Sequence, residues 1–159
     1  MNTETTEKLG KHFLYPSTVW VSAEPYEITT ILGSCVAVCL FDQKLFIGGM
    51  NHYMLPLWNG SGLASPKYGN IAIEKLLEKL ILLGCKPDNI TAKIFGGAEI
   101  IEKKSMNYNI GAQNIEIALE MLHDKKIPIV SSSLGGNLGR KIIFNTATGE
   151  VRQIYIIRS

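Results

Sequence analysis

Short apolar runs with the alternation typical of β-strands dominate both ends of the chain. Turn-favouring residues such as Gly, Pro, Asn, Asp and Ser separate these runs. Within them β-branched and aromatic side chains, which fit a pleated surface, are frequent. The pattern predicts strands over 18–23, 26–32, 36–41, 45–50, 91–95, 127–133, 140–146 and 151–158.

Two segments in the middle of the chain follow the helical period instead. The first is expected over 66–83, because Ser65 can cap its start, Pro66 suits the first helical position and Gly84 favours its end. The second is expected over 110–126. The apolar positions that define these two faces are Ile73, Leu76, Leu77, Leu80 and Leu83, then Ile115, Ala118, Leu119 and Leu122.

The order of these elements is strands, helix, strand, helix, strands. Such segregation predicts an α+β fold in which mixed, largely antiparallel sheets are layered with two amphipathic helices. The polar residues 1–11 are expected to form a flexible N-terminal tail, and residues 12–159 a single domain. The segment 53–65 contains Pro and Gly and is expected to be a surface loop near a site.

Composition narrows the class of protein. The chain has 159 residues, of which 46% are hydrophobic and 19% charged, which is typical of one globular domain. A net charge of +2 with scattered lysines argues against nucleic-acid binding. We expect no membrane insertion, because the most apolar stretch is short and charged. Three cysteines without a CxxC pair indicate free thiols in a reducing cytoplasm.

Candidate chemistry centres on Cys35 and His52. They lie at opposite ends of a predicted hairpin, and a two-residue turn at 43–44 would place them directly opposite each other. A thiol beside an imidazole is the minimal unit of cysteine nucleophilic catalysis. A neighbouring imidazolium would lower the thiol pKa and make the thiolate a major species.

A third group should orient the imidazole. Thr29 and Thr30 lie on opposite faces of the strand 26–32, and alternation alone does not choose between them. Cys39 and Cys85 are expected to be buried and inert, His12 to belong to the tail, and His123 to lie at a helix C-terminus. The glycine clusters lack phosphate-loop spacing, and no metal-ligand pattern is present.

Several motifs resemble the CheD family of chemoreceptor glutamine deamidases, over a region from about residue 16 to the C-terminus. In chain order they include TILGSCVAVCLFD, GGMNHYMLP, IFGGAE, NIGAQN and GGNLGR. The resemblance implies a CheD-like sandwich and a catalytic triad of Cys, His and Thr. Carried over by position, the nucleophile is Cys35, the histidine is His52, and the threonine six residues before the cysteine is Thr29.

The resemblance implies a cysteine-dependent protein-glutamine glutaminase that converts glutamines of methyl-accepting chemotaxis receptors to glutamate through a thioester. It implies no cofactor. The alternative is a regulatory module that binds and stimulates a CheC-type chemotaxis phosphatase. A third interpretation, a cysteine hydrolase of small amides, would require a deep enclosed pocket.

Overall fold

The computed structural model describes residues 9–99 and 109–157. Within these ranges the chain forms nine strands, two α-helices and one short 3-10 helix. The strands are β1 (Gly10–Phe13), β2 (Thr18–Ser22), β3 (Tyr26–Leu32), β4 (Val36–Asp42), β5 (Ile47–His52), β6 (Ile90–Gly96), β7 (Ile129–Leu134), β8 (Gly139–Asn145) and β9 (Val151–Ile156). The helices are α1 (Gly69–Leu82), α2 (Ile110–Asp124) and the 3-10 helix Pro87–Asn89.

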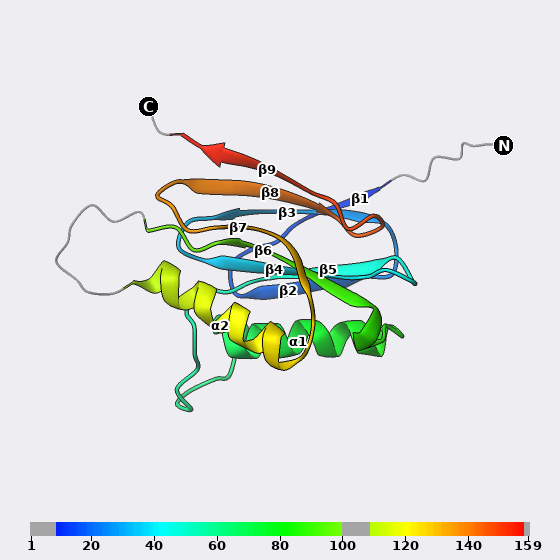
Figure 1. Cartoon of the computed structure of the whole chain (residues 1–159), viewed down its shortest axis with the longest axis horizontal. Coiled ribbons are helices and arrows are strands. Elements are labelled where there is room, and N and C mark those ends of the chain that lie inside the picture. The colour runs from blue at the N-terminus through cyan, green and yellow to red at the C-terminus, as the bar shows by residue number, and fades with distance from the viewer. Residues whose placement is uncertain (1–8, 100–108, 158–159) are drawn as a thin grey trace.

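These elements stack in three layers (Figure 1). A four-stranded sheet, in the order β1-β3-β8-β9, lies over a five-stranded sheet, in the order β2-β5-β4-β6-β7. Both helices cover the other face of the five-stranded sheet. Among the strands of residues 9–99 and 109–157, the pairs β1–β3 and β6–β7 are parallel and the other pairs are antiparallel. The predicted fold class, an α+β fold of mixed, largely antiparallel sheets layered with two helices, is therefore confirmed.

The central strand β4 supplies both cores of the molecule. Val36, Val38 and Leu40 pack with the apolar faces of the helices. Ala37 and Cys39 point the other way and pack between the two sheets. Because both faces of the strand are buried, its sequence is a continuous apolar run and does not alternate with polar residues.

The N-terminal part of the fold begins earlier than the sequence predicts. β1 starts at Gly10 and pairs with β3, so Gly10 and Lys11 belong to the sheet and not to a tail. His12 also belongs to β1, and its ring stacks on Trp20 at 3.8 Å between centroids. The mixed polar sequence GKHF gives no strand signal, because a short edge strand buries few apolar groups. The expected tail otherwise falls on residues 1–8, which lie outside the described residues.

The helix α1 begins at Gly69, three residues after the predicted start at Pro66. The preceding segment is engaged elsewhere, because the carbonyl of Lys67 accepts hydrogen bonds from the amides of Met54 and Leu55 at 2.9 and 3.1 Å. The predicted end is confirmed, since α1 closes at Leu82 and Gly84 follows with a φ of 102°. A positive φ is accessible to glycine at little cost, which explains the stop.

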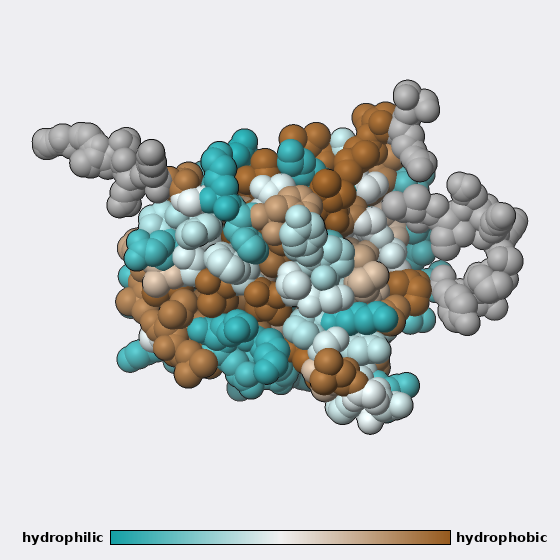
Figure 2. All heavy atoms as spheres, turned by 180° about the vertical axis from the view of Figure 1, so that it is seen from behind, coloured by the Kyte–Doolittle hydropathy of each residue, from teal (hydrophilic) through white to brown (hydrophobic). Residues whose placement is uncertain are grey.

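Neither of the two helices that the structure describes covers the outer face of the four-stranded sheet (Figure 1). Its exposed apolar side chains include Ile31 on β3 and Ile154 and Ile156 on β9. Figure 2 shows apolar atoms gathered at the upper right of the molecule, beside the C-terminal end of β9. Among the described residues, neither helix has the length and apolar character needed to span a bilayer.

Candidate active site

Cys35 lies in the bend between β3 and β4, where the two sheets meet. The amide of Gly97 donates to the carbonyl of Cys35 at 2.9 Å, and the amide of Ala98 donates to that of Gly33 at 3.0 Å. Gly96 has a φ of 111° and no room for a Cβ beside the Cys35 carbonyl. The glycine pair of the FGGAE motif therefore permits the close approach that fixes the bend. Cys35 is half-buried against the inter-sheet core.

The hairpin β4–β5 differs from the predicted one by its turn. Asp42 pairs with Ile47, so the loop contains four residues and not two. The Asp42 carboxylate accepts hydrogen bonds from the amides of Lys44 and Leu45 at 2.8 and 2.9 Å, and Phe46 takes a φ of 59°. Gln43-Lys44 lacks the Gly or Asn that a two-residue turn favours, and the aspartate instead organises a longer one.

This longer turn shifts the register by two residues. Val36 pairs with Tyr53, so His52 lies opposite Ala37 and not opposite Cys35. A shift of two leaves every side chain on its predicted face. Cys35 and His52 consequently occupy diagonal positions on the inter-sheet face, where such neighbours are about 7–8 Å apart. Within the described ranges, no hydrogen bond joins their side chains.

The His52 imidazole is buried and held by one hydroxyl from the opposite sheet. Its Nδ1 lies 2.7 Å from Oγ1 of Thr30, a residue of β3. The same hydroxyl donates its proton to the carbonyl of Leu14 at 2.6 Å. A hydroxyl has one proton to donate, so Oγ1 must accept from Nδ1–H. This fixes the tautomer and leaves Nε2 as a buried lone pair with no partner among the residues described.

Thr29, the threonine that the resemblance implies, is placed differently. It is the neighbour of Thr30 on β3, and its side chain therefore projects from the other face of the strand. It pairs with Phe13 on β1 and Ile143 on β8 and is partly exposed, whereas Thr30 is fully buried. The hydrogen-bonding partner of His52 is thus Thr30 in place of Thr29.

The protonation states of the pair follow from burial. Burial lowers the pKa of His52 to about 4, so the imidazole is neutral at neutral pH. Burial also raises the pKa of the Cys35 thiol, and the residue's own backbone N–H opposes this rise. The expected thiolate–imidazolium pair is therefore wrong for the resting protein. A neutral imidazole with a free Nε2 is instead suited to accept the thiol proton.

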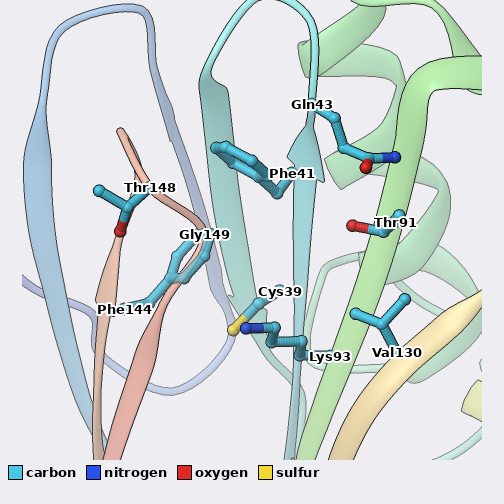
Figure 3. A pocket seen from close by; sticks show the side chains of 9 residues that line it. All are labelled: Cys39, Phe41, Gln43, Thr91, Lys93, Val130, Phe144, Thr148 and Gly149. Carbon is cyan, nitrogen blue, oxygen red and sulfur yellow. The ribbon is translucent and has the colours of Figure 1, made fainter.

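Cys39 and Cys85 are buried, with exposed fractions of 1% and 3%. Burial raises the pKa of both thiols, and the nearby Asp42 contributes to a value of about 11 for Cys85. Cys39 lies on the wall of a cavity of about 210 Å³ that Lys93, Phe41 and Gly149 also line (Figure 3). No histidine lines this cavity, so Cys39 lacks the base that lies beside Cys35.

The other two histidines are remote from this site. His12 lies in β1, where its ring stacks on Trp20. His123 lies exposed in the last turn of α2, with its Nδ1 3.8 Å from Oδ1 of Asp124. Within residues 9–99 and 109–157, no three His, Cys, Asp or Glu side chains gather as metal ligands.

Two asparagines beside the site carry no signal that the sequence patterns revealed. The Asn51 side chain accepts from the amide of Val38 at 2.8 Å, taking a place in the ladder between β4 and β5. Asn114 of α2 donates from Nδ2 to the carbonyls of Ser34 and Met54 at 2.9 and 3.0 Å. Asn51 lies in the motif GGMNHYMLP and Asn114 in the motif NIGAQN, both of which resemble the CheD family. Their place in these motifs was the one signal in the sequence that pointed to a role at the site.

Comparison with known proteins identifies the family of the chain. The family model described as "CheD chemotactic sensory transduction" matches residues 54–154. A protein of Trichlorobacter lovleyi is 52% identical over 151 residues, which cover 95% of this chain and 94% of that protein. A protein of Sulfurimonas denitrificans is 49% identical over 92% of this chain and 94% of its own length. A third, of Rhodospirillum rubrum, is 43% identical over 90% and 81%. All three are named probable chemoreceptor glutamine deamidase CheD. The chain belongs to the CheD family.

Proposed function

We propose that this protein is a cysteine-dependent protein-glutamine deamidase that acts on chemotaxis receptors. The observation that carries the proposal is the fixed tautomer of His52. Because Thr30 holds Nδ1–H, the buried Nε2 is the free base on the face that also carries Cys35. The names of the relatives supply the substrate, since they are called chemoreceptor glutamine deamidases.

The first half of the reaction forms a thioester. His52 Nε2 takes the proton of the Cys35 thiol while the sulfur attacks the carboxamide carbon of a receptor glutamine. The carbonyl oxygen becomes an oxyanion, which backbone N–H groups of the 33–35 bend would stabilise. When the oxyanion collapses, the C–N bond breaks and His52 gives its proton to the leaving nitrogen. Ammonia departs.

The second half restores the enzyme. His52 takes a proton from water, and the resulting hydroxide adds to the thioester carbon. The C–S bond then breaks, and the sulfur recovers the proton from His52. The receptor is left with glutamate in place of glutamine. Cys35 forms and breaks the covalent bond, His52 moves protons, and Thr30 acts as a positioning residue for the imidazole.

The site suits a protein substrate in the cytoplasm. Cys35 is only half-buried and lies in a bend between elements, at the edge of the inter-sheet core. A half-buried position of this kind can receive a side chain presented by a folded partner. The three free cysteines fit a reducing compartment, which supports a cytoplasmic location.

The test is incubation of the protein with receptor cytoplasmic fragments, followed by mass mapping of their peptides. Each deamidated glutamine should gain about one dalton, because NH₂ is exchanged for OH, and ammonia should appear in equal amount. Receptor peptides of unchanged mass after prolonged incubation would contradict the proposed activity.

The rival function is a regulatory module for a CheC-type phosphatase. It would not require an ordered base beside a thiol, so the Thr30–His52 hydrogen bond favours catalysis. The two functions are separable, since a Cys35→Ala protein would lose deamidation and keep any binding that activates such a phosphatase.

A matched pair of variants separates the two neighbouring threonines. Thr30→Val keeps the shape of the side chain but removes the hydroxyl that orients His52, and kcat should fall by about 10–100-fold, as when other oriented imidazoles lose their partner. Thr29→Val should leave kcat close to the wild-type value, because the Thr29 side chain projects from the face of β3 opposite to His52. Initial rates by peptide mass spectrometry measure both, and Thr30→Ser should restore most of the activity. A larger loss for Thr29→Val would return the orienting role to Thr29.

A further inference from the structure

Asn114 joins the two chain segments that carry the candidate nucleophile and base. Its side chain is fully buried in the second turn of α2. Nδ2 donates to the carbonyl of Ser34, which precedes Cys35, and to the carbonyl of Met54, two residues after His52. No other side chain among the described residues bonds to both segments.

The location of this contact explains why an amide is needed there. Val36 and Tyr53 form the last backbone pair before β4 and β5 separate, with N–H···O distances of 3.2 and 3.0 Å. Just beyond that pair, the carbonyls of Ser34 and Met54 are both acceptors and cannot bond to each other. An NH₂ group has two donors and can connect them. The Asn114 amide thus takes the place of the next rung of the ladder.

Asn114 is itself held firmly. The hydroxyl of Tyr53, the residue after His52, donates to the main-chain carbonyl of Asn114 at 2.6 Å. One turn earlier, Gly111 packs against the carbonyls of Gly97 and Ala98 with no space for a Cβ. The amides of those same two residues bind the Cys35 and Gly33 carbonyls. The start of α2 therefore contacts the Cys35 bend from two sides.

We propose that Asn114 is a positioning residue that sets the distance between the Cys35 sulfur and the His52 imidazole. The inference deepens the proposed function and rests on it, because spacing matters only if the two groups exchange a proton. Removing the amide would release the Ser34 and Met54 carbonyls from each other. A displacement of about 1 Å between reacting groups can reduce the rate about 10²-fold.

Alkylation of Cys35 by iodoacetamide tests the spacing without any receptor. The rate at Cys35 is followed by peptide mass mapping at pH 7 for four proteins: wild type, His52→Ala, Asn114→Ala and the double variant. His52→Ala should slow alkylation about 10²-fold by removing the base. Asn114→Ala should slow it comparably, and the double variant should be no slower than His52→Ala alone, because both changes disrupt one proton transfer.

Leu122→Ala is the matched control for a general loss of packing. Leu122 is also a fully buried residue of α2 but contacts neither Ser34 nor Met54 through hydrogen bonds. It should lower the thermal midpoint while keeping alkylation of Cys35 dependent on His52. If Asn114→Ala does not fold, Asn114→Ser, which retains one donor, takes its place and should give an intermediate rate.

Two results would overturn the proposal. One is additive slowing in the double variant, and the other is an Asn114 variant in which His52→Ala still slows alkylation by the wild-type factor. With receptor fragments, the Asn114 variant should lose kcat at unchanged KM. If the wild type deamidates no receptor while the alkylation rates still show the coupling, the proposed function fails and the positioning role stands.

Discussion

Replacing Cys35 with alanine should lower glutamine deamidation by about 10⁴–10⁶-fold, the scale of loss when a covalent nucleophile is removed. The other thiol that the structure describes on this face, Cys39, is buried, and no histidine lines the cavity beside it, so it should not take over formation of the thioester. The Cys35 side chain is small and only half-buried, so the variant should keep its fold. The measurement is the mass of receptor peptides after incubation, with the thermal midpoint recorded to confirm that the variant is folded.

Cys39→Ala and Cys85→Ala are the matched controls, because each removes a thiol that burial keeps protonated. Both variants should deamidate receptors at close to the wild-type rate, although each loses a little stability from the core. Deamidation that survives in Cys35→Ala and disappears in Cys39→Ala would transfer the nucleophile to the cavity beside Lys93.

Replacing His52 with alanine should reduce kcat by about 10²–10⁴-fold, the usual contribution of a positioned acid–base group. Combining it with Cys35→Ala should cost nothing more than Cys35→Ala alone, because the two residues act as one unit. Initial rates for the single and double variants measure this. Independent, multiplicative losses would show that His52 acts away from the sulfur.

The pH dependence reports the environment of the same imidazole. A base must be neutral to accept a proton, and burial lowers the pKa of His52 to about 4. The acid limb of kcat/KM should therefore lie well below pH 6.5, the ordinary histidine value. Rates taken immediately after a pH jump would measure it, and a limb near pH 6.5 would mean that the ring is solvated.

The free energy of unfolding should also depend on the protonation of His52. The pKa of His52 is lower in the folded protein than in the unfolded chain, so the folded state prefers the neutral ring. The resulting contribution is fully present above pH 6.5 and is lost as pH falls from 6.5 to about 4. It amounts to about 3 kcal/mol. Denaturant unfolding at several pH values measures this loss, and His52→Ala should flatten the curve in that window.

The sequence placed Cys35 directly opposite His52, whereas the structure places the two residues in diagonal positions on the same face. The predicted turn was two residues too short, yet the two side chains still share a face, because strand parity survives an even shift. Had the turn differed by one residue, the same argument would have separated them. Hydrophobic alternation thus predicts which face a residue takes more securely than which residue lies opposite it.

Hydrophobic alternation did not identify the threonine that orients His52. Ile28, Thr30 and Leu32 point inward on β3, but Ile31 on the outer face is also apolar and is 48% exposed. With apolar residues on both faces, the pattern does not say which threonine is buried. The contacts of Asn114 could not be predicted from hydrophobic alternation either. Its partners are backbone carbonyls of residues distant in the sequence, and every residue has such a carbonyl.

The hydrogen bonds that join Leu14, Thr30 and His52 cross from one sheet to the other. A chain in which only the five-stranded layer has formed would hold the sulfur and the ring, yet the ring could carry its proton on either nitrogen. Full catalytic activity would then develop only at the last step of folding, when the two sheets pack together. A newly made or damaged copy would therefore react more slowly with stray amides until both layers were in place.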